Sequence, residues 1–574
     1  MSRIVSRLAR VVSQVPRLLQ CRVDQTRIRL GLRLHPSIRR YLQFSRKLWK
    51  ERPVADGGAE ILVGLFHWYP SIHNYAFVTN FLARKHGGTI RWFHFFPGRD
   101  WLCEELFSSF GARPGLWLDG LQLDEARAAK ITKAIFVGLK TKWDVVNITV
   151  DGVTIGDLIY DTYLRAGPAS TVDVSDPRLE AILLEAVRLL LACRDYLARH
   201  RVVALIPDHL VYIHCGIIVR LAFLARIPIY LVNYGQDFHL LKIEGDPADC
   251  QIPMRWPYAD YPRLFATLSA TEQERAREQA RQTLRVRLSG KADGILTLAQ
   301  LVTGESAVQS AYAGGSDQAL MEDNGRPRIL VLLHDFCDAV HVFREMLFPD
   351  FFEWIHFLLA HASETAFDWY VKPHPNVARG GALAAANQHV LNDLKAQYPR
   401  IRFLEPTTSS AQIVREGVQA MFTVYGTGGH EFAYMGIPVV NAGDNPHIGY
   451  AFNLHPRTVA EYADCIANAA TLQVQMRQAD IEEYVYMNYF YFPQRARAGA
   501  NPMPARYFSS EDYLKHYSRP ETLDHLTEPF DDGERRRLDA YFDDFFRTRA
   551  AAEGGQSSEN NQPISAGIDC EYTK

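Results

Sequence analysis

Two short motifs combine residue types that bind anions and act on them. The first is Val371-Lys-Pro-His-Pro-Asn376, and the second is Tyr425-Gly-Thr-Gly-Gly-His-Glu431. Each motif follows an apolar run of strand length, and in an open parallel sheet ligands bind just beyond the carboxyl ends of the strands. The two motifs therefore predict one binding site at that edge of a sheet.

The first motif supplies two groups that act on negative charge. Its prolines fix the loop, so His374 projects in a defined direction, while Lys372 contributes a permanent positive charge. A protonated imidazole beside a departing nucleotide phosphate would neutralise developing negative charge or donate a proton. We therefore predict that His374 is catalytic and that Lys372 binds the phosphate. The dipeptide His-Pro is uninformative on its own, so the prediction depends on its place at a strand end.

The second motif predicts a phosphate site. Gly426, Thr427, Gly428 and Gly429 let the main chain approach a ligand, and their amides open a helix whose N-terminus attracts anions. Glu431, inside that helix, can accept hydrogen bonds from ribose hydroxyls, as acidic residues do in dinucleotide sites. A glutamate in a first helical turn also complements the helix dipole by about 0.3 to 1 kcal/mol without any ligand. That second explanation remains open.

Two residues are candidates for a general base. The strand Val202 to Ile206 ends in Pro207-Asp208-His209, where a carboxylate beside an imidazole suits a base or an anchor for an acceptor hydroxyl. His67 lies in an earlier strand-to-helix loop and could face a ligand. A histidine packed among aromatic residues is the competing explanation for His67.

The loop that begins at His334 also contains Asp335, Asp338 and His341. These residues are metal-ligand types, but their spacing matches no zinc pattern, so we expect the loop to line the donor pocket, with His334 among the donor-binding residues. No Asp-x-Asp follows a strand to hold a divalent metal on a diphosphate. The expectation is a metal-independent site with no cofactor.

The order of strands and helices predicts two α/β units. At 574 residues the chain is too long for one ordinary core, and strand-helix alternation before and after a Gly/Ser/Asp/Asn-rich stretch predicts two parallel sheets. The predicted segments are a basic amphipathic arm (1–52), an N-terminal Rossmann-like acceptor domain (53–312), a hinge (313–327), a C-terminal Rossmann-like nucleotide-sugar domain (328–475), C-terminal helices (476–549) and a disordered tail (550–574).

Composition narrows the class of protein. A net charge of −2 excludes a nucleic-acid-coating protein. The eight cysteines are scattered without a C-x-x-C pair, which indicates reduced thiols and a cytoplasmic location. No apolar run has the roughly 18 to 20 residues of a membrane span. The basic arm predicts either peripheral contact with an anionic inner-membrane surface or packing of its apolar face on the body.

The motif Lys372-Pro-His-Pro, together with Gly426-Thr-Gly-Gly-His-Glu-Phe-Ala-Tyr-Met-Gly-Ile-Pro-Val-Val440, resembles bacterial capsule and surface-polysaccharide biosynthesis proteins of the GT-B glycosyltransferase class. It is similar to signatures of capsular Kdo-transferases and bacterial sialyltransferases, which use CMP-activated sugars. The likeness covers roughly residues 58 to 495. It implies two Rossmann-like domains that face each other across a cleft, the second binding the donor and the first the acceptor.

By motif position the resemblance implies that His374 meets the donor phosphate, that Thr427 and nearby amides bind it, and that Glu431 holds the ribose. The family's base lies in the first domain and has no motif here, so Asp208 is the first candidate and His67 the second. This chain departs from the family at Gly428-Gly429-His430, where many relatives carry bulkier residues.

The resulting functional prediction is a glycosyltransferase that moves a sugar from a nucleotide-activated donor to a growing surface glycan of the capsule or lipopolysaccharide type. Its expected partners are the nucleotide-sugar and a glycan or lipid-linked glycan acceptor, without nucleic acid. The alternatives are a non-catalytic GT-B-like protein of a polysaccharide locus and a nucleotide-sugar epimerase.

Overall fold

The structure is a computed structural model that describes residues 34–50, 58–66, 69–96, 98, 100–121, 124–232, 240–288, 319–343, 345–375, 377, 382–492, 520–527 and 531–554. Several predictions fall outside these residues. They are His67, the first part of the basic arm, residues 313–318 of the hinge and residues 555–574 of the tail.

The first half of the chain contains a four-stranded parallel sheet with the order β3-β2-β1-β6. Every residue of β1 is buried, as expected for a central strand covered on both faces. A short antiparallel pair, β7 with β8, follows β6. The strands are β1 (Ala59–Gly64), β2 (Gly88–His94), β3 (Arg113–Trp117), β6 (Arg201–Ile206), β7 (Tyr230–Val232) and β8 (Leu240–Lys242), with a small hairpin of β4 (Thr149–Val150) and β5 (Val153–Thr154).

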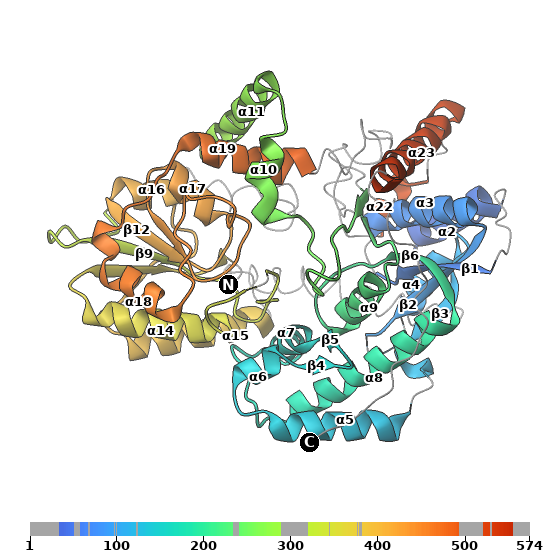
Figure 1. The fold of residues 1–574 in the computed structure, drawn as a ribbon, viewed down its shortest axis with the longest axis horizontal. Coiled ribbons are helices and arrows are strands. Elements are labelled where there is room, and N and C mark those ends of the chain that lie inside the picture. The colour runs from blue at the N-terminus through green and yellow to red at the C-terminus, as the bar shows by residue number, and fades with distance from the viewer. Residues whose placement is uncertain are drawn as a thin grey trace, which may run out of the picture.

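Helices of the first half connect these strands and cover the sheet (Figure 1). The long helix α8 starts where a capping residue and a proline predict it. The Asp176 carboxylate accepts a hydrogen bond from the Arg178 amide, and Pro177 occupies the first helical position. The helices are α3 (Tyr69–His86), α4 (Trp101–Ser108), α5 (Glu125–Gly138), α6 (Lys142–Val146), α7 (Gly156–Ala166), α8 (Pro177–Arg199) and α9 (Ile213–Leu224).

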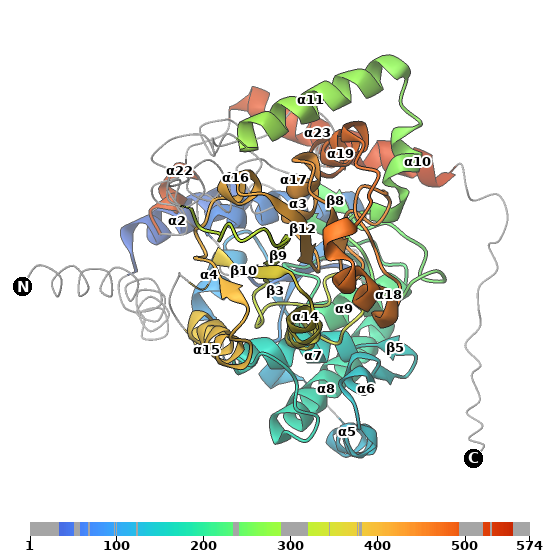
Figure 2. The same ribbon diagram turned by 90° about the vertical axis from the view of Figure 1, so that its left-hand side faces the viewer.

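The second half contains a five-stranded parallel sheet with the order β11-β10-β9-β12-β13. Helices α14 and α18 lie on one side of it, and α16 and α17 lie on the other (Figures 1 and 2). The elements are β9 (Arg328–Leu332), α14 (Phe351–Glu364), β10 (Asp368–Lys372), α15 (Ala382–Gln397), β11 (Arg402–Phe403), α16 (Ser410–Arg415), β12 (Val418–Thr423), α17 (Gly428–Tyr434), β13 (Val439–Asn441) and α18 (Val459–Ala467).

The α/β class with two parallel sheets is confirmed, and the strand predicted from Val202 to Ile206 is β6 (Arg201–Ile206). Among the described residues, none of the helices combines the length and apolarity that crossing a membrane requires. The cysteines of the described residues are free thiols.

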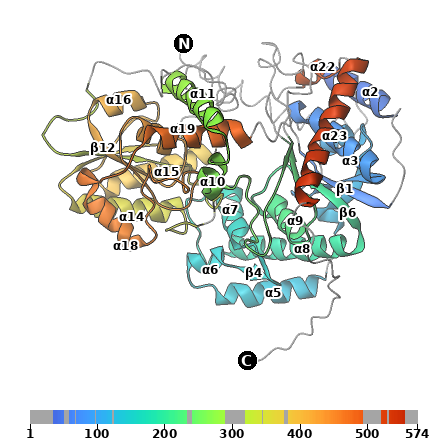
Figure 3. The same ribbon diagram turned by 45° about the horizontal axis from the view of Figure 1, so that its top comes forward.

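Helices that precede the second sheet in the chain pack on the second half, and helices near the end of the described chain pack on the first half (Figures 1 and 3). Helices α10 (Tyr261–Phe265) and α11 (Ala270–Leu288) pack on α19 (Gln478–Tyr486), although residues up to 312 were expected in the first domain. The aromatic run from Tyr484 to Phe492 forms the end of α19 and the π-helical turn Met487–Tyr491 that continues it.

The two ends of the described chain both lie on the first half. Helix α2 (Pro36–Lys50) packs on α22 (Thr522–His525), where Ser37 and Arg40 donate hydrogen bonds to the Asp524 carboxylate at 2.7 and 2.9 Å. The apolar side chains of α2 are buried, which is the body-packing alternative for this part of the arm. Helix α23 (Asp532–Gly554) includes residues 550–554 of the predicted disordered tail.

Replacing Phe542 tests this docking of the C-terminal helix. Phe542 is 1 % exposed, and its ring centroid lies 4.7 Å from that of Phe81 on α3. We expect Phe542→Ala to lower the free energy of unfolding by about 3 to 5 kcal/mol, as measured by urea denaturation. The control is Val137→Ala on α5, where the side chain is 75 % exposed and the expected change is within about 0.5 kcal/mol. Equal effects of the two substitutions would show that α23 is not docked.

Candidate functional site

Three neighbouring strands of the second sheet bring the predicted donor-binding residues to one edge. Because β9 lies between β10 and β12, the carboxyl ends of these strands present Lys372 and His374, His334, and Gly426 side by side. His374 is close enough to His334 for its charge to contribute to lowering the pKa of His334. Residues distant in sequence therefore meet at the edge where parallel sheets bind ligands.

Lys372 carries a buried positive charge. The residue is 9 % exposed because it ends β10, whose residues are all buried. Within the described part of the chain its ammonium group makes no hydrogen bond and no ion pair within 4 Å. Burial lowers the pKa of Lys372, and the charge of Glu431 opposes that shift. An ammonium group in such surroundings gains strongly from an incoming anion.

Glu431 is paired with a cation that the sequence did not reveal. Its Oε1 atom lies 3.0 Å from Nε of Arg287, and both side chains are almost fully buried. Arg287 comes from α11, so this ion pair joins the helix before the second sheet to α17 within it. Lys372 also acts on Glu431, which leaves one carboxylate between two cations. The predicted ribose contact of Glu431 stays a prediction.

His334 is held as a neutral imidazole in a defined tautomer. Its ring stacks on Phe351 with centroids 4.5 Å apart, and its Nε2 atom accepts a hydrogen bond from the Val424 amide at 3.2 Å. Since a main-chain amide can only donate, Nε2 is unprotonated and Nδ1 carries the hydrogen. Burial, with a smaller contribution from His374, lowers the pKa of His334 to about 3. The Nδ1–H group makes no hydrogen bond to the described residues and is available to a ligand.

The glycines of the second motif serve two different purposes. A Cβ atom on Gly428 would lie 2.5 Å from Cδ1 of Leu332, and one on Gly429 would lie 2.5 Å from Cε1 of His447. Close packing therefore explains these two glycines without a ligand. Gly426 is exposed and has φ +112°, a backbone conformation that favours glycine. Gly426 and the partly exposed Thr427 and Gly428 form the accessible part of the motif, whereas Gly429 is buried.

The first sheet contributes Asp208 from the carboxyl end of β6. Burial raises the pKa of Asp208, while a hydrogen bond from the Cys215 thiol and the charge of His209 oppose the shift. A Cβ atom on Gly64, at the end of β1, would lie 3.3 Å from Oδ1 of Asp208, so a glycine leaves room for the carboxylate. A partly buried carboxyl group at a strand end is the environment that a general base requires.

The loop after β9 connects the two groups of residues. The Tyr212 hydroxyl, near Asp208, donates a hydrogen bond to Oδ1 of Asp338 at 2.9 Å. Further along the loop, Nδ1 of His341 lies 2.7 Å from Oδ1 of Asp161 on α7. The loop thus contacts the first half along its length. Among the described residues no group of three or more His, Cys, Asp or Glu side chains is arranged to hold a metal ion.

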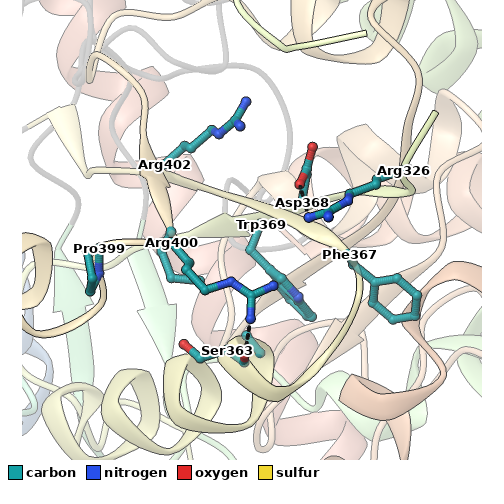
Figure 4. A pocket seen from close by; sticks show the side chains of 10 residues that line it. Arg326, Ser363, Phe367, Asp368, Trp369, Pro399, Arg400 and Arg402 are labelled. Carbon is teal, nitrogen blue, oxygen red and sulfur yellow. Dashed lines mark hydrogen bonds and ion pairs between the residues drawn. The ribbon is translucent and has the colours of Figure 1, made fainter. Parts of the chain in front are cut away.

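A pocket of about 230 Å³ lies at the other edge of the second sheet (Figure 4). It is lined by Asp368 and Arg402, which start β10 and β11, and by Arg326 and Arg400. Each arginine already has a partner, since Arg400 donates to the Ser363 carbonyl at 2.9 Å, Arg402 pairs with Glu322 at 2.7 Å, and Arg326 lies 3.8 Å from Asp368. This pocket is separate from the edge that holds Lys372.

Comparisons with known proteins found no matching family model and no matching curated protein. Among solved structures, a KpsC β-Kdo 2,4-transferase from Thermosulfurimonas dismutans is 13 % identical with a TM-score of 0.31, covering 50 % of this chain and 79 % of that one. CalG4, the calicheamicin glycosyltransferase, is 13 % identical with a TM-score of 0.18, covering 87 % of this chain and 99 % of that one. These low scores support no conclusion about substrate or reaction.

A substitution at Gly428 tests the packing explanation. We expect Gly428→Ala to lower the free energy of unfolding by about 1 to 3 kcal/mol because its Cβ would overlap Leu332. The measurement is urea denaturation. Gly138→Ala in α5 is the matched control, since a Cβ there meets nothing within 4 Å and the change should be neutral or stabilising. If Gly428→Ala leaves the free energy of unfolding unchanged, packing does not explain this glycine, and close approach of a ligand becomes its better explanation.

A second prediction concerns the charge on Lys372. The pKa of Lys372 in the folded protein is lower than its value of 10.5 in the unfolded chain. The buried ammonium group therefore destabilises the folded protein by its full amount at pH values below the folded-state pKa. This destabilisation disappears as the pH rises from the folded-state pKa to 10.5. Lys372→Met should therefore raise the free energy of unfolding at pH 7 without ligand, and the gain should shrink at alkaline pH. Urea denaturation across a pH series measures this. Lys133→Met on the exposed face of α5 should show no such trend, and a destabilised Lys372→Met would mean that the ammonium has a partner.

Proposed function

We propose that this protein is a glycosyltransferase that takes a sugar from a nucleotide-activated donor and adds it to a growing surface glycan of the capsule or lipopolysaccharide type. The observation that carries the proposal is the buried ammonium group of Lys372, which has no ion pair among the described residues. A donor phosphate at the edge of the second sheet would supply the missing negative charge.

The neighbouring groups fit the same ligand. The Nδ1–H group of His334 offers a hydrogen bond from a neutral imidazole, and His374 lies beside it. Among the described residues, Lys372 and Arg287 place two positive charges beside the single negative charge of Glu431. These features favour an anion at the carboxyl ends of β9, β10 and β12, where parallel sheets bind nucleotides.

The proposed reaction divides its steps between the two halves. The bond between the sugar carbon and the phosphate oxygen breaks, and Lys372 and His374 stabilise the negative charge that develops on the leaving nucleotide. The acceptor hydroxyl forms the new glycosidic bond and gives its proton to Asp208, whose pKa is raised by burial. Lys372 and His374 would supply the charge that a divalent metal provides in other transferases, so we expect activity to persist in a chelator.

The arrangement of two parallel sheets supports a GT-B type of division, with the donor on the second and the acceptor on the first. The sequence motifs that resemble capsule-biosynthesis transferases lie on the second sheet, as that division requires. The acceptor, the sugar and the base of the nucleotide are not distinguished by these features.

Nucleotide release from a panel of CMP-, UDP- and GDP-sugars, with and without glycan acceptors and with a chelator present, tests the proposal. We expect Lys372→Met to weaken binding of the productive nucleotide at least tenfold, about 1.4 kcal/mol, when measured by calorimetry. We expect His374→Ala to lower the turnover rate about 100-fold.

Lys133→Met serves as the charge-matched control and should retain both binding and turnover. The transferase proposal fails if the wild-type protein releases no nucleotide from any donor in the panel. It also fails if Lys372→Met and His374→Ala release nucleotide as fast as the wild type.

A further inference from the structure

The turn that follows Asp208 contains a strained residue. Tyr212 has φ +63° and ψ +155°, a backbone conformation that is nearly restricted to glycine. Asp151 and Arg226 also have positive φ, at 47° and 54°. Tyr212 differs from them because it lies between the candidate base and the helix α9 that follows it.

Main-chain hydrogen bonds hold this strained turn in place. The Tyr212 carbonyl accepts a hydrogen bond from the Gly216 amide at 2.8 Å, which begins α9. The next amide, of Ile213, donates to the Thr162 hydroxyl of α7 at 3.0 Å. The Tyr212 ring stacks on His209, with centroids 5.9 Å apart and planes at 29°. Tyr212 is therefore fixed by contacts to α9, to α7 and to the ring of His209, the residue next to Asp208.

The Tyr212 side chain reaches the second half of the molecule. Its hydroxyl donates to Oδ1 of Asp338 at 2.9 Å, and Arg165 of α7 lies 3.8 Å from the same oxygen. Burial and the Asp338 carboxylate raise the pKa of Tyr212, so the hydroxyl remains a donor at neutral pH. Asp338 belongs to the loop that begins at His334 in the candidate donor site.

We propose that Tyr212 is a positioning residue that couples the two halves of the site. Its hydrogen bond to Asp338 holds the strained turn, and with it Asp208 and His209, in the reactive orientation only while the loop after β9 is in place. The expected effect of this coupling on the turnover rate rests on the proposed transferase function. The coupling itself can be measured by hydrogen–deuterium exchange, which requires no activity.

Hydrogen–deuterium exchange of the full chain, followed by mass spectrometry, tests the coupling. Asp338→Ala changes only the second half, yet we expect exchange in peptides covering residues 207–216 of the first half to accelerate at least tenfold. Asp338→Asn keeps an acceptor oxygen for the tyrosine and should restore slow exchange. Tyr163→Phe is the matched control, because it removes a 2.6 Å tyrosine–aspartate bond to Asp176 within the first half, and it should leave this segment unchanged.

Kinetics give the second test. Tyr212→Phe keeps the ring and removes only the hydroxyl, and we expect it to lower the turnover rate of transfer at least tenfold while nucleotide affinity changes less than twofold. Asp338→Ala should act alike, and the double variant should be no slower than either single variant, since both remove the same bond.

Unchanged exchange in residues 207–216 of Asp338→Ala would overturn the coupling, as would rate losses that multiply in the double variant. If the wild-type protein transfers no sugar, the proposed function fails, and the exchange measurement still decides whether Tyr212 couples the halves.

Discussion

The candidate site depends on a buried positive charge, the ammonium group of Lys372, which no ion pair among the described residues neutralises. Lys372 ends a strand with no exposed residues, so its ammonium group cannot be hydrated as a surface lysine is. Glu431 offsets part of this charge but is itself paired with Arg287. Such an arrangement is costly in the empty protein and becomes favourable when an anion arrives, which is the pattern expected when stability is given up for binding.

The ion pair between Glu431 and Arg287 also joins α11, which precedes the second sheet in the chain, to α17 beside that sheet. Arg287 belongs to a helix that precedes this sheet in the chain and yet packs on α19, which follows it. Two further pairs, Arg281 with Glu482 at 2.8 Å and Arg277 with Glu483 at 3.6 Å, fix α11 on α19. The charge balance at Lys372 is thus set by a helix from before the hinge.

The fold was largely predictable from the sequence, whereas the site was predictable only in part. Apolar runs such as Ile329 to Val331 predict buried strands. Because parallel strands end at the same edge of a sheet, both motifs were expected at one edge, where the strand order places them. Contacts across the fold leave no such signal. Arg287 is one of several arginines in its helix, and the strain at Tyr212 arises from tertiary contacts, so neither could be singled out. Gly428 and Gly429 match a phosphate loop, but close packing against Leu332 and His447 accounts for the same glycines, and the sequence pattern does not separate these two explanations.

The two ends of the described chain meet on the first half, and this has a consequence for biosynthesis. Phe542, Phe545 and Phe546 complete a core that includes Phe81 and Tyr230. During translation, the early residues emerge from the ribosome long before these late ones exist. The first half must therefore keep an unfilled apolar surface until residues 542–546 have been synthesised, a period in which chaperones protect nascent chains from aggregation.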